Sequence, residues 1–373
     1  MSRRQTAARA AMATRNLDGL LLFQQESLYY LMGYDTTGYV AFQCLLLLPE
    51  GAATLLTRQR ERLQAELTSS IEDIRTWQET EDADPVAELA SLLEGAGCRG
   101  RRLGIELNAW GMTATRWQQI QAGLDGFCQL VDASDLVSEL RLIKSPAEIA
   151  CARRAAELAD LSLAAAARLC LSGAYEGDIV GAMQGALFRG GGDYPNGMVA
   201  GSGPGALMVR GYSGYRKLDP NDQMQLEFAG AYRHYHAALM RTILTGGASD
   251  YQLSMHEACV AALTACQQAC RPGQTFGQVF DAQAQVFDKA GFENCRLKAC
   301  GYSLGATFGA SWMDYPMLFS GNPVEIQPHM VIFLHMILLD SEAATAMSLG
   351  ETVVVGEGAC QRLSAADWKL IVN

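Results

Sequence analysis

One stretch near the middle of the chain gathers side chains that could move protons. Glu227 stands between Leu226 and Phe228, and two of the five histidines, His234 and His236, follow shortly after it. A carboxylate in an apolar strand costs free energy unless it is paired or used, so Glu227 is a candidate base or nucleophile. Imidazoles titrate near neutral pH, so the two histidines are candidates for general acid–base catalysis.

The elements that position these groups are predicted from the same stretch. Apolar and aromatic residues alternate along 226–242 around a turn that contains Gly230, which is typical of a β-hairpin. Residues two apart on a strand share a face, so His234 and His236 are expected on one side. His234 could equally point to solvent at the tip, whereas His236 lies deeper. For Glu227, an ion pair with an arginine such as Arg241 is the structural alternative.

Three further polar side chains could serve a small-molecule site. Arg210, close to Tyr212, could hold a substrate carboxylate through two hydrogen bonds, or could be a surface residue of a mobile loop. Asp314 could hold a substrate ammonium or amidinium, or could be a turn residue before Pro316. His335 lies in an apolar run, where a hydrogen-bonded core histidine is the alternative to a role in the site.

Composition excludes several classes of protein. The net charge of −11 argues against nucleic acid and anionic membrane surfaces as partners. No apolar run approaches the ~20 residues that span a bilayer, and the basic N-terminus lacks the apolar core of a signal peptide. The eleven cysteines show no CxxC pairs, which favours a reducing cytoplasm over a disulfide framework.

Length and periodicity predict two domains. A chain of 373 residues exceeds the usual size of a single core. Up to about residue 135, short apolar strands alternate with helical segments, which indicates an α/β domain. A long helix is then predicted from Ser145-Pro146, a cap followed by proline. Helices and hairpins after it indicate an α+β domain. The predicted domains are 1–140 and 141–373.

Several motifs fall in the order seen in one enzyme family. They are Asp18–Phe23, Tyr29–Asp35, Leu140–Ile149, Gly201–Pro204, Arg271–Gly273 and Gly301–Gly305. With these motifs the chain resembles the creatinase and Xaa-Pro peptidase family over nearly its whole length. The resemblance implies a pita-bread catalytic domain of α+β class, preceded by a smaller α/β domain of creatinase type.

The resemblance also bears on metal binding. Peptidases of this family bind divalent ions through ligands in the order Asp, Asp, His, Glu, Glu. The equivalent positions here are Glu227, Ala238, Tyr302, His335 and Gly350, with Glu351 next to the last. At most two or three potential ligands remain, so no catalytic metal and no cofactor are expected.

Creatinase and ectoine hydrolase are similar members that cleave non-peptide C–N bonds without a metal. Tyr302–Gly305 and Tyr34–Tyr39 look most like the ectoine hydrolase pattern, although Arg210 stands where those enzymes have a catalytic histidine. The leading hypothesis is a metal-independent hydrolase of an amidine, cyclic amidine or amide bond in a small carboxylate-bearing solute. The expected catalytic residues are Glu227, His236, His335 and Tyr302. The expected substrate-binding residues are Arg210, His234, Tyr212, Asp314, Tyr34 and Glu351.

Two other functions stay open. A metallopeptidase with a remodelled site could hold one metal through Glu227, His236, His335 and Glu351. A non-catalytic relative could use the pocket to bind a ligand or a partner. In each case a homodimer is expected, because relatives insert the loop equivalent to Tyr29–Tyr39 into the partner's pocket.

Overall fold

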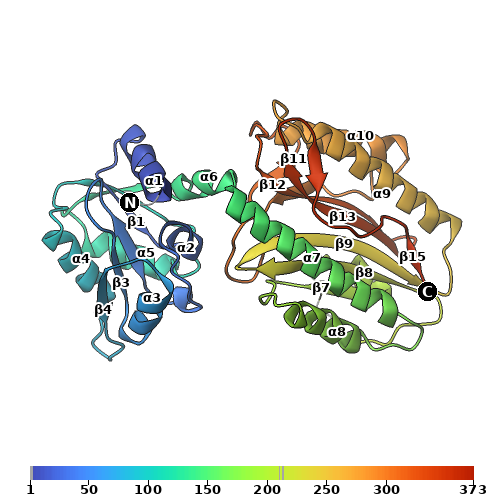
Figure 1. Cartoon of the computed structure of the whole chain (residues 1–373), viewed down its shortest axis with the longest axis horizontal. Helices are drawn as coiled ribbons and strands as arrows, with labels where there is room; N and C mark the ends of the chain where they lie inside the picture. Colours follow the sequence, from blue (N-terminus) through green and yellow to red (C-terminus); the bar gives the residue numbers. More distant parts are fainter. Residues whose placement is uncertain (1–2, 210, 212–213) are drawn as a thin grey trace. The chain divides into compact units, whose positions relative to one another are not determined.

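The computed structural model describes residues 3–209, 211 and 214–373. The chain forms two compact units, Met1–Arg141 and Leu142–Asn373 (Figure 1). The first is an α/β unit and the second an α+β unit, so the predicted fold class is confirmed. Among the described residues, no helix is both long enough and apolar enough to cross a membrane.

The first unit is a mixed sheet covered by helices on both faces. Alternate residues of the central strand divide between two cores, with Leu20 and Leu22 on one face and Leu21 on the other. The strand order is β4 (Asp73–Trp77), β3 (Thr54–Arg58), β2 (Cys44–Leu47), β1 (Gly19–Leu22), β5 (Arg102–Ile105) and β6 (Gln129–Asp132). One face packs against α1 (Arg3–Thr14), α2 (Gln25–Met32), α3 (Arg62–Thr68) and α6 (Leu136–Leu142), and the other against α4 (Pro85–Gly95) and α5 (Ala114–Gly123).

The second unit is built on one mostly antiparallel sheet. Its strand order is β11 (Asp314–Phe319), β10 (Ala299–Ser303), β12 (Val331–Asp340), β13 (Thr345–Val355), β9 (Tyr235–Thr245), β8 (Asp222–Tyr232) and β7 (Val199–Ser202). Two short strands complete it: β14 (Cys360–Arg362) pairs with β13, and β15 (Ile371–Val372) pairs with β9. Its helices are α7 (Pro146–Leu169), α8 (Glu176–Arg189), α9 (Asp250–Ala269) and α10 (Phe276–Lys289).

Three of these helices begin with a capping box. A Ser or Thr accepts from the backbone N–H three residues on, and a Glu or Gln at that position accepts from the backbone N–H of the cap. The pairs are Ser145 with Glu148, Ser249 with Gln252, and Thr275 with Gln278. These caps fix where α7, α9 and α10 start against the sheet.

All four helices pack on one face of the sheet, which we call the outer face. Leu226 and Phe228 of β8 contact α7 and α8, and Leu334 and Met336 of β12 contact α9 and α10 (Figure 1). Because side chains alternate along a strand, the residues between these point to the opposite, inner face. Glu227 and His335 are therefore inner-face residues.

The hairpin of β8 and β9 differs from the prediction at its turn. The turn residues are Arg233 and His234, both with left-handed backbone at φ 50° and 63°. Gly230 lies within β8, where a Cβ would stand 1.9 Å from the carbonyl oxygen of Ala155 in α7. The glycine therefore serves close helix–strand packing. His234 lies in the turn and not on a strand, so the strand spacing that predicted a face shared with His236 does not apply to it.

Candidate functional site

The inner face brings together two side chains from strands that are not neighbours. Three strands separate β8 from β10 in the sheet order, yet the Tyr302 hydroxyl lies 3.2 Å from Oε1 of Glu227. The strong twist of the sheet therefore curls the inner face, so that a carboxylate and a phenol meet across it. This contact defines the centre of the candidate site.

The hydrogen-bond direction at this contact follows from a third side chain. Trp312 is buried, and its indole Nε1 donates to the Tyr302 hydroxyl at 2.9 Å. An indole can only donate, so the phenol oxygen accepts from Trp312. The phenol's own hydrogen is then directed to Glu227. The chain Trp312–Tyr302–Glu227 therefore gives the carboxylate one hydrogen-bond donor from the phenol.

His335 adds an imidazole to the same face. It lies on β12, the strand next to Tyr302, and the two ring centroids are 5.7 Å apart. Phe333 packs against both rings at 5.5 and 5.7 Å. The imidazole is held in an apolar setting and is 6% exposed. Glu227, Tyr302 and His335 thus lie on the same face of the sheet, with the His335 ring beside the Tyr302 ring.

A small hollow lies directly beside Glu227. Its volume is about 30 Å³. Besides the carboxylate it is lined mainly by apolar side chains: Val199, Ala206, Met208, Met240, Ile337 and Leu339. A hollow of this volume has room for about one water molecule, next to the Glu227 carboxylate.

The donor set does not fit the two-metal centre of the peptidases. Ala238 and Met240 pack in one apolar cluster with Tyr302 and Phe333. The Tyr302 oxygen is engaged by Trp312 and Glu227. Within the described ranges, no group of three or more His, Cys, Asp or Glu side chains could hold a metal ion.

His236 lies on the inner face nearer the hairpin turn. Its ring Nδ1 is 3.2 Å from the Thr307 hydroxyl, and its Nε2 has no hydrogen-bond partner among the described residues. Burial lowers the pKa of this imidazole to about 4, so the ring is neutral at pH 7. A buried neutral ring with an open nitrogen can accept or donate one hydrogen bond to a ligand.

Glu351 lies on the outer face and is not brought to Glu227. It pairs opposite Leu334, whose side chain contacts α9. Its carboxylate forms a buried ion pair with Arg241 and accepts from the Trp368 indole at 3.0 Å. Burial raises the pKa of this carboxyl group. The arginine considered for Glu227 is thus engaged by Glu351.

The other predicted substrate-binding residues lie on several different elements. His234 stacks on Phe308 with 4.1 Å between ring centroids. Asp314 begins β11 opposite Ser303, next to Tyr302 in the chain. Tyr34 is fully buried in the core of the first unit. Arg210 and Tyr212 lie outside the described residues.

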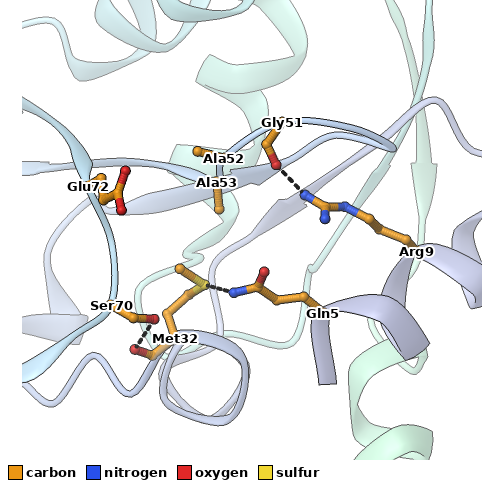
Figure 2. A pocket seen from close by; sticks show the side chains of 8 residues that line it. All are labelled: Gln5, Arg9, Met32, Gly51, Ala52, Ala53, Ser70 and Glu72. Carbon is orange, nitrogen blue, oxygen red and sulfur yellow. Dashed lines mark hydrogen bonds between the residues drawn. The ribbon is translucent and has the colours of Figure 1, made fainter. Parts of the chain in front are cut away.

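A larger pocket of about 420 Å³ lies in the first unit (Figure 2). Two of its polar side chains form hydrogen bonds within the first unit. Arg9 donates to the Gly51 carbonyl oxygen at 2.6 Å, and Gln5 Nε2 donates to the Met32 sulfur at 3.0 Å. Glu72 contributes an exposed carboxylate. The pocket lacks the pairing of carboxylate, phenol and imidazole that the inner face provides.

Comparisons with known proteins agree with this architecture. Residues 150–357 match the sequence profile of metallopeptidase family M24, and residues 4–143 match the creatinase/prolidase N-terminal domain. Among solved structures, the prolidase of Thermococcus sibiricus aligns with a TM-score of 0.90 at 21% identity, covering 100% of both chains. The Xaa-Pro dipeptidase of Bacillus anthracis aligns with a TM-score of 0.87 at 18% identity, covering 99% of both.

Sequence relatives include proteins with different names. An uncharacterised hydrolase/peptidase of Sinorhizobium fredii is 26% identical over 99% of this chain and 96% of its own. The ectoine hydrolase of Halomonas elongata is 23% identical over 98% and 95%. The Xaa-Pro dipeptidase of Pyrococcus horikoshii is 21% identical over 96% of each.

Proposed function

We propose that this chain, which belongs to metallopeptidase family M24 and carries a creatinase/prolidase N-terminal domain, is a hydrolase of a C–N bond. Unlike the peptidases of the family, it would act without a metal ion. Its substrate would be a small, carboxylate-bearing nitrogenous solute with an amidine, cyclic amidine or amide group. The similarity to ectoine hydrolase over nearly the full chain supports this substrate class.

One observation carries the proposal. Tyr302, at the position of the family's metal-binding histidine, donates to Glu227 at 3.2 Å. A phenol that donates to the carboxylate supplies a hydrogen bond in place of a metal ion, and the carboxylate is then proposed to act on carbon or on water. The alternative with one metal needs Glu351 as a ligand, and this residue lies on the outer face in an ion pair.

In the proposed reaction, Glu227 either removes a proton from the attacking water or adds to the substrate carbon itself. In the first route the bond from the water oxygen to carbon forms, the C–N bond breaks, and the leaving nitrogen receives the proton that the water lost. In the second route the C–N bond breaks as an ester forms with Glu227, and a water molecule then cleaves that ester and regenerates the carboxylate. His335 supplies or accepts that proton, with His236 as a second hydrogen-bonding group. Tyr302 orients the reacting groups. Arg210 is proposed to hold the substrate carboxylate.

A solute screen tests the proposal. Purified protein is incubated with ectoine and with creatine, and the products are followed by mass spectrometry. The Glu227→Gln variant is the control, since the amide keeps the shape of the side chain but cannot act as base or nucleophile. We expect the variant to lose at least ~10²-fold in rate. Absence of turnover with every amidine and cyclic amidine tested would contradict the proposed function.

We further propose that the protein is a cytoplasmic homodimer. The apolar residues Val40 and Trp110 are 61% and 55% exposed. Arg116 connects the loops that carry them, because it donates to the carbonyl oxygens of Val40 and Gly111. Such exposed groups suit a contact with a second copy. All eleven cysteines are free thiols, in keeping with a reducing compartment. Light scattering that shows a monomer at micromolar concentration would refute the dimer.

A further inference from the structure

One buried carboxylate binds two separated points of the chain next to the site. Glu176 is the first residue of α8 and is 4% exposed. Its Oε1 accepts from the backbone N–H and the hydroxyl of Ser202, at 2.8 and 2.6 Å. Its Oε2 accepts from the backbone N–H groups of Gly214 and Tyr215, at 3.0 and 3.2 Å. The carboxylate therefore binds the chain at Ser202, directly before the turn Gly203–Leu207, and again at Gly214 and Tyr215.

An arginine strengthens this attachment. Arg216 donates to the Ser202 hydroxyl at 2.8 Å and forms ion pairs with Asp219 and Asp222. Its carbonyl oxygen accepts from the Glu176 backbone N–H at 3.0 Å. Hydrogen bonds to ionised groups are the strong ones, and here they form a connected network. The two points of the chain are therefore fixed to α8 by polar contacts.

The segment between these points supplies one wall of the hollow at Glu227. Ala206, Met208 and Val209 line the hollow beside the carboxylate. Met208 is 54% exposed, so packing against the core holds it only in part. The position of this wall therefore depends on the attachment of the segment at its two ends.

We propose that Glu176 is a positioning residue that sets this wall against Glu227 and thereby determines how tightly the substrate is held. The consequence for the substrate rests on the proposed function, whereas the effect on the wall does not. A carboxylate at the start of a helix also stabilises that helix. A loss of stability alone would therefore not distinguish the two roles.

The test uses Glu176→Gln in the full-length protein. The amide keeps the volume, but its NH₂ group cannot accept from the backbone N–H that it faces, whether that of Ser202 or those of Gly214 and Tyr215. Asp160→Asn is the matched control, because Asp160 accepts from the Ser364 hydroxyl and the Ala365 backbone N–H on a different segment. Hydrogen exchange is followed by mass spectrometry over residues 203–216 and over the rest of α8. The kinetics are measured with ectoine or creatine, whichever is turned over.

We expect amide exchange over 203–216 to accelerate by about tenfold or more in Glu176→Gln and to stay unchanged in Asp160→Asn. KM should rise by about tenfold, with kcat changed by less than about twofold, as for lost uniform binding. Unchanged exchange over 203–216, or acceleration confined to α8, would overturn the positioning of the wall. Faster exchange with an unchanged KM would overturn its effect on the substrate. If no solute is turned over, the proposed function fails, and the exchange measurement alone decides the positioning role.

Discussion

Tyr302→Phe is the substitution that most directly probes the arrangement of the site. It removes one oxygen atom and leaves the aromatic ring in place. That oxygen accepts from Trp312 at 2.9 Å and donates to Glu227 at 3.2 Å. Both hydrogen bonds are lost at once, while the ring contacts with Phe333 and His335 are retained.

The magnitude follows from the two lost contacts. The Trp312 side chain is buried, so its N–H would be left without an acceptor, at a cost of about 1–3 kcal/mol in the free energy of unfolding. The hydrogen bond to the Glu227 carboxylate, worth about 1.5–3 kcal/mol, is lost from the site. If the contact is maintained in the transition state, kcat/KM falls by about 10- to 100-fold.

The assay combines urea unfolding with steady-state kinetics on four proteins. These are the wild type, Tyr302→Phe, Trp312→Phe and the double variant. Tyr251→Phe is the control, because Tyr251 lies on α9, which packs on the outer face, and its phenol donates to Asp340 at the end of β12 at 2.6 Å. We expect the control to retain full activity and to lose less than about 1 kcal/mol.

The stability of the double variant tests whether Tyr302 and Trp312 are coupled. Phenylalanine at position 312 removes the N–H that Tyr302→Phe leaves unpaired, so the double variant should be less destabilised than the sum of the single variants. Additive losses of stability would mean that the two side chains are not coupled. Full activity of Tyr302→Phe would mean that the phenol does not act on Glu227.

The remaining predictions concern single groups. Glu351→Gln should lower the free energy of unfolding by about 3–5 kcal/mol without raising KM, since it leaves the buried Arg241 unneutralised; an unchanged stability with a raised KM would instead place Glu351 at the substrate. His236 has a folded pKa of about 4 against an ordinary 6.5, so the unfolded chain binds the proton first and stability falls as the pH drops from 6.5 toward 4. In His236→Asn, the free energy of unfolding should fall less steeply over this pH range, by about 1.4 kcal/mol per pH unit. Urea unfolding at each pH measures this slope, and a slope equal to that of the wild type would contradict the prediction. Arg210→Ala should raise KM with kcat less affected, and an unchanged KM would exclude a role as carboxylate anchor.

The sequence predicted the elements better than the directions of individual side chains. The predicted helix from Ser145-Pro146 is observed as α7, because its capping box is local and complete. The turn of the hairpin was misplaced, because Gly230 signals both a turn and a close helix contact, and only tertiary packing decides between them. Arg233 and His234 adopt positive φ without the glycine that usually announces such a turn.

The alternation of side chains along a strand explains why Glu351 does not reach the candidate site. Glu351 was placed at the substrate because it adjoins Gly350, but a shift of one residue along a strand turns the side chain to the other face. It therefore meets Arg241 and not Glu227. The part played by Trp312 could not be predicted, because the hydrogen bond to Tyr302 depends on how the loop between β10 and β11 folds back. The nearness of Trp312 to Tyr302 in the chain was the available signal.

Metal content measured together with turnover tests the central claim most directly. The protein is purified without chelators, its zinc, manganese and other divalent metals are quantified, and hydrolysis of the solute identified in the screen is measured before and after dialysis against a chelator. Because the family resemblance places Ala238 and Tyr302 where peptidases have metal ligands, we expect far less than one metal ion per chain and unchanged turnover after dialysis. Stoichiometric metal, with activity lost on dialysis and restored by adding the ion, would contradict it.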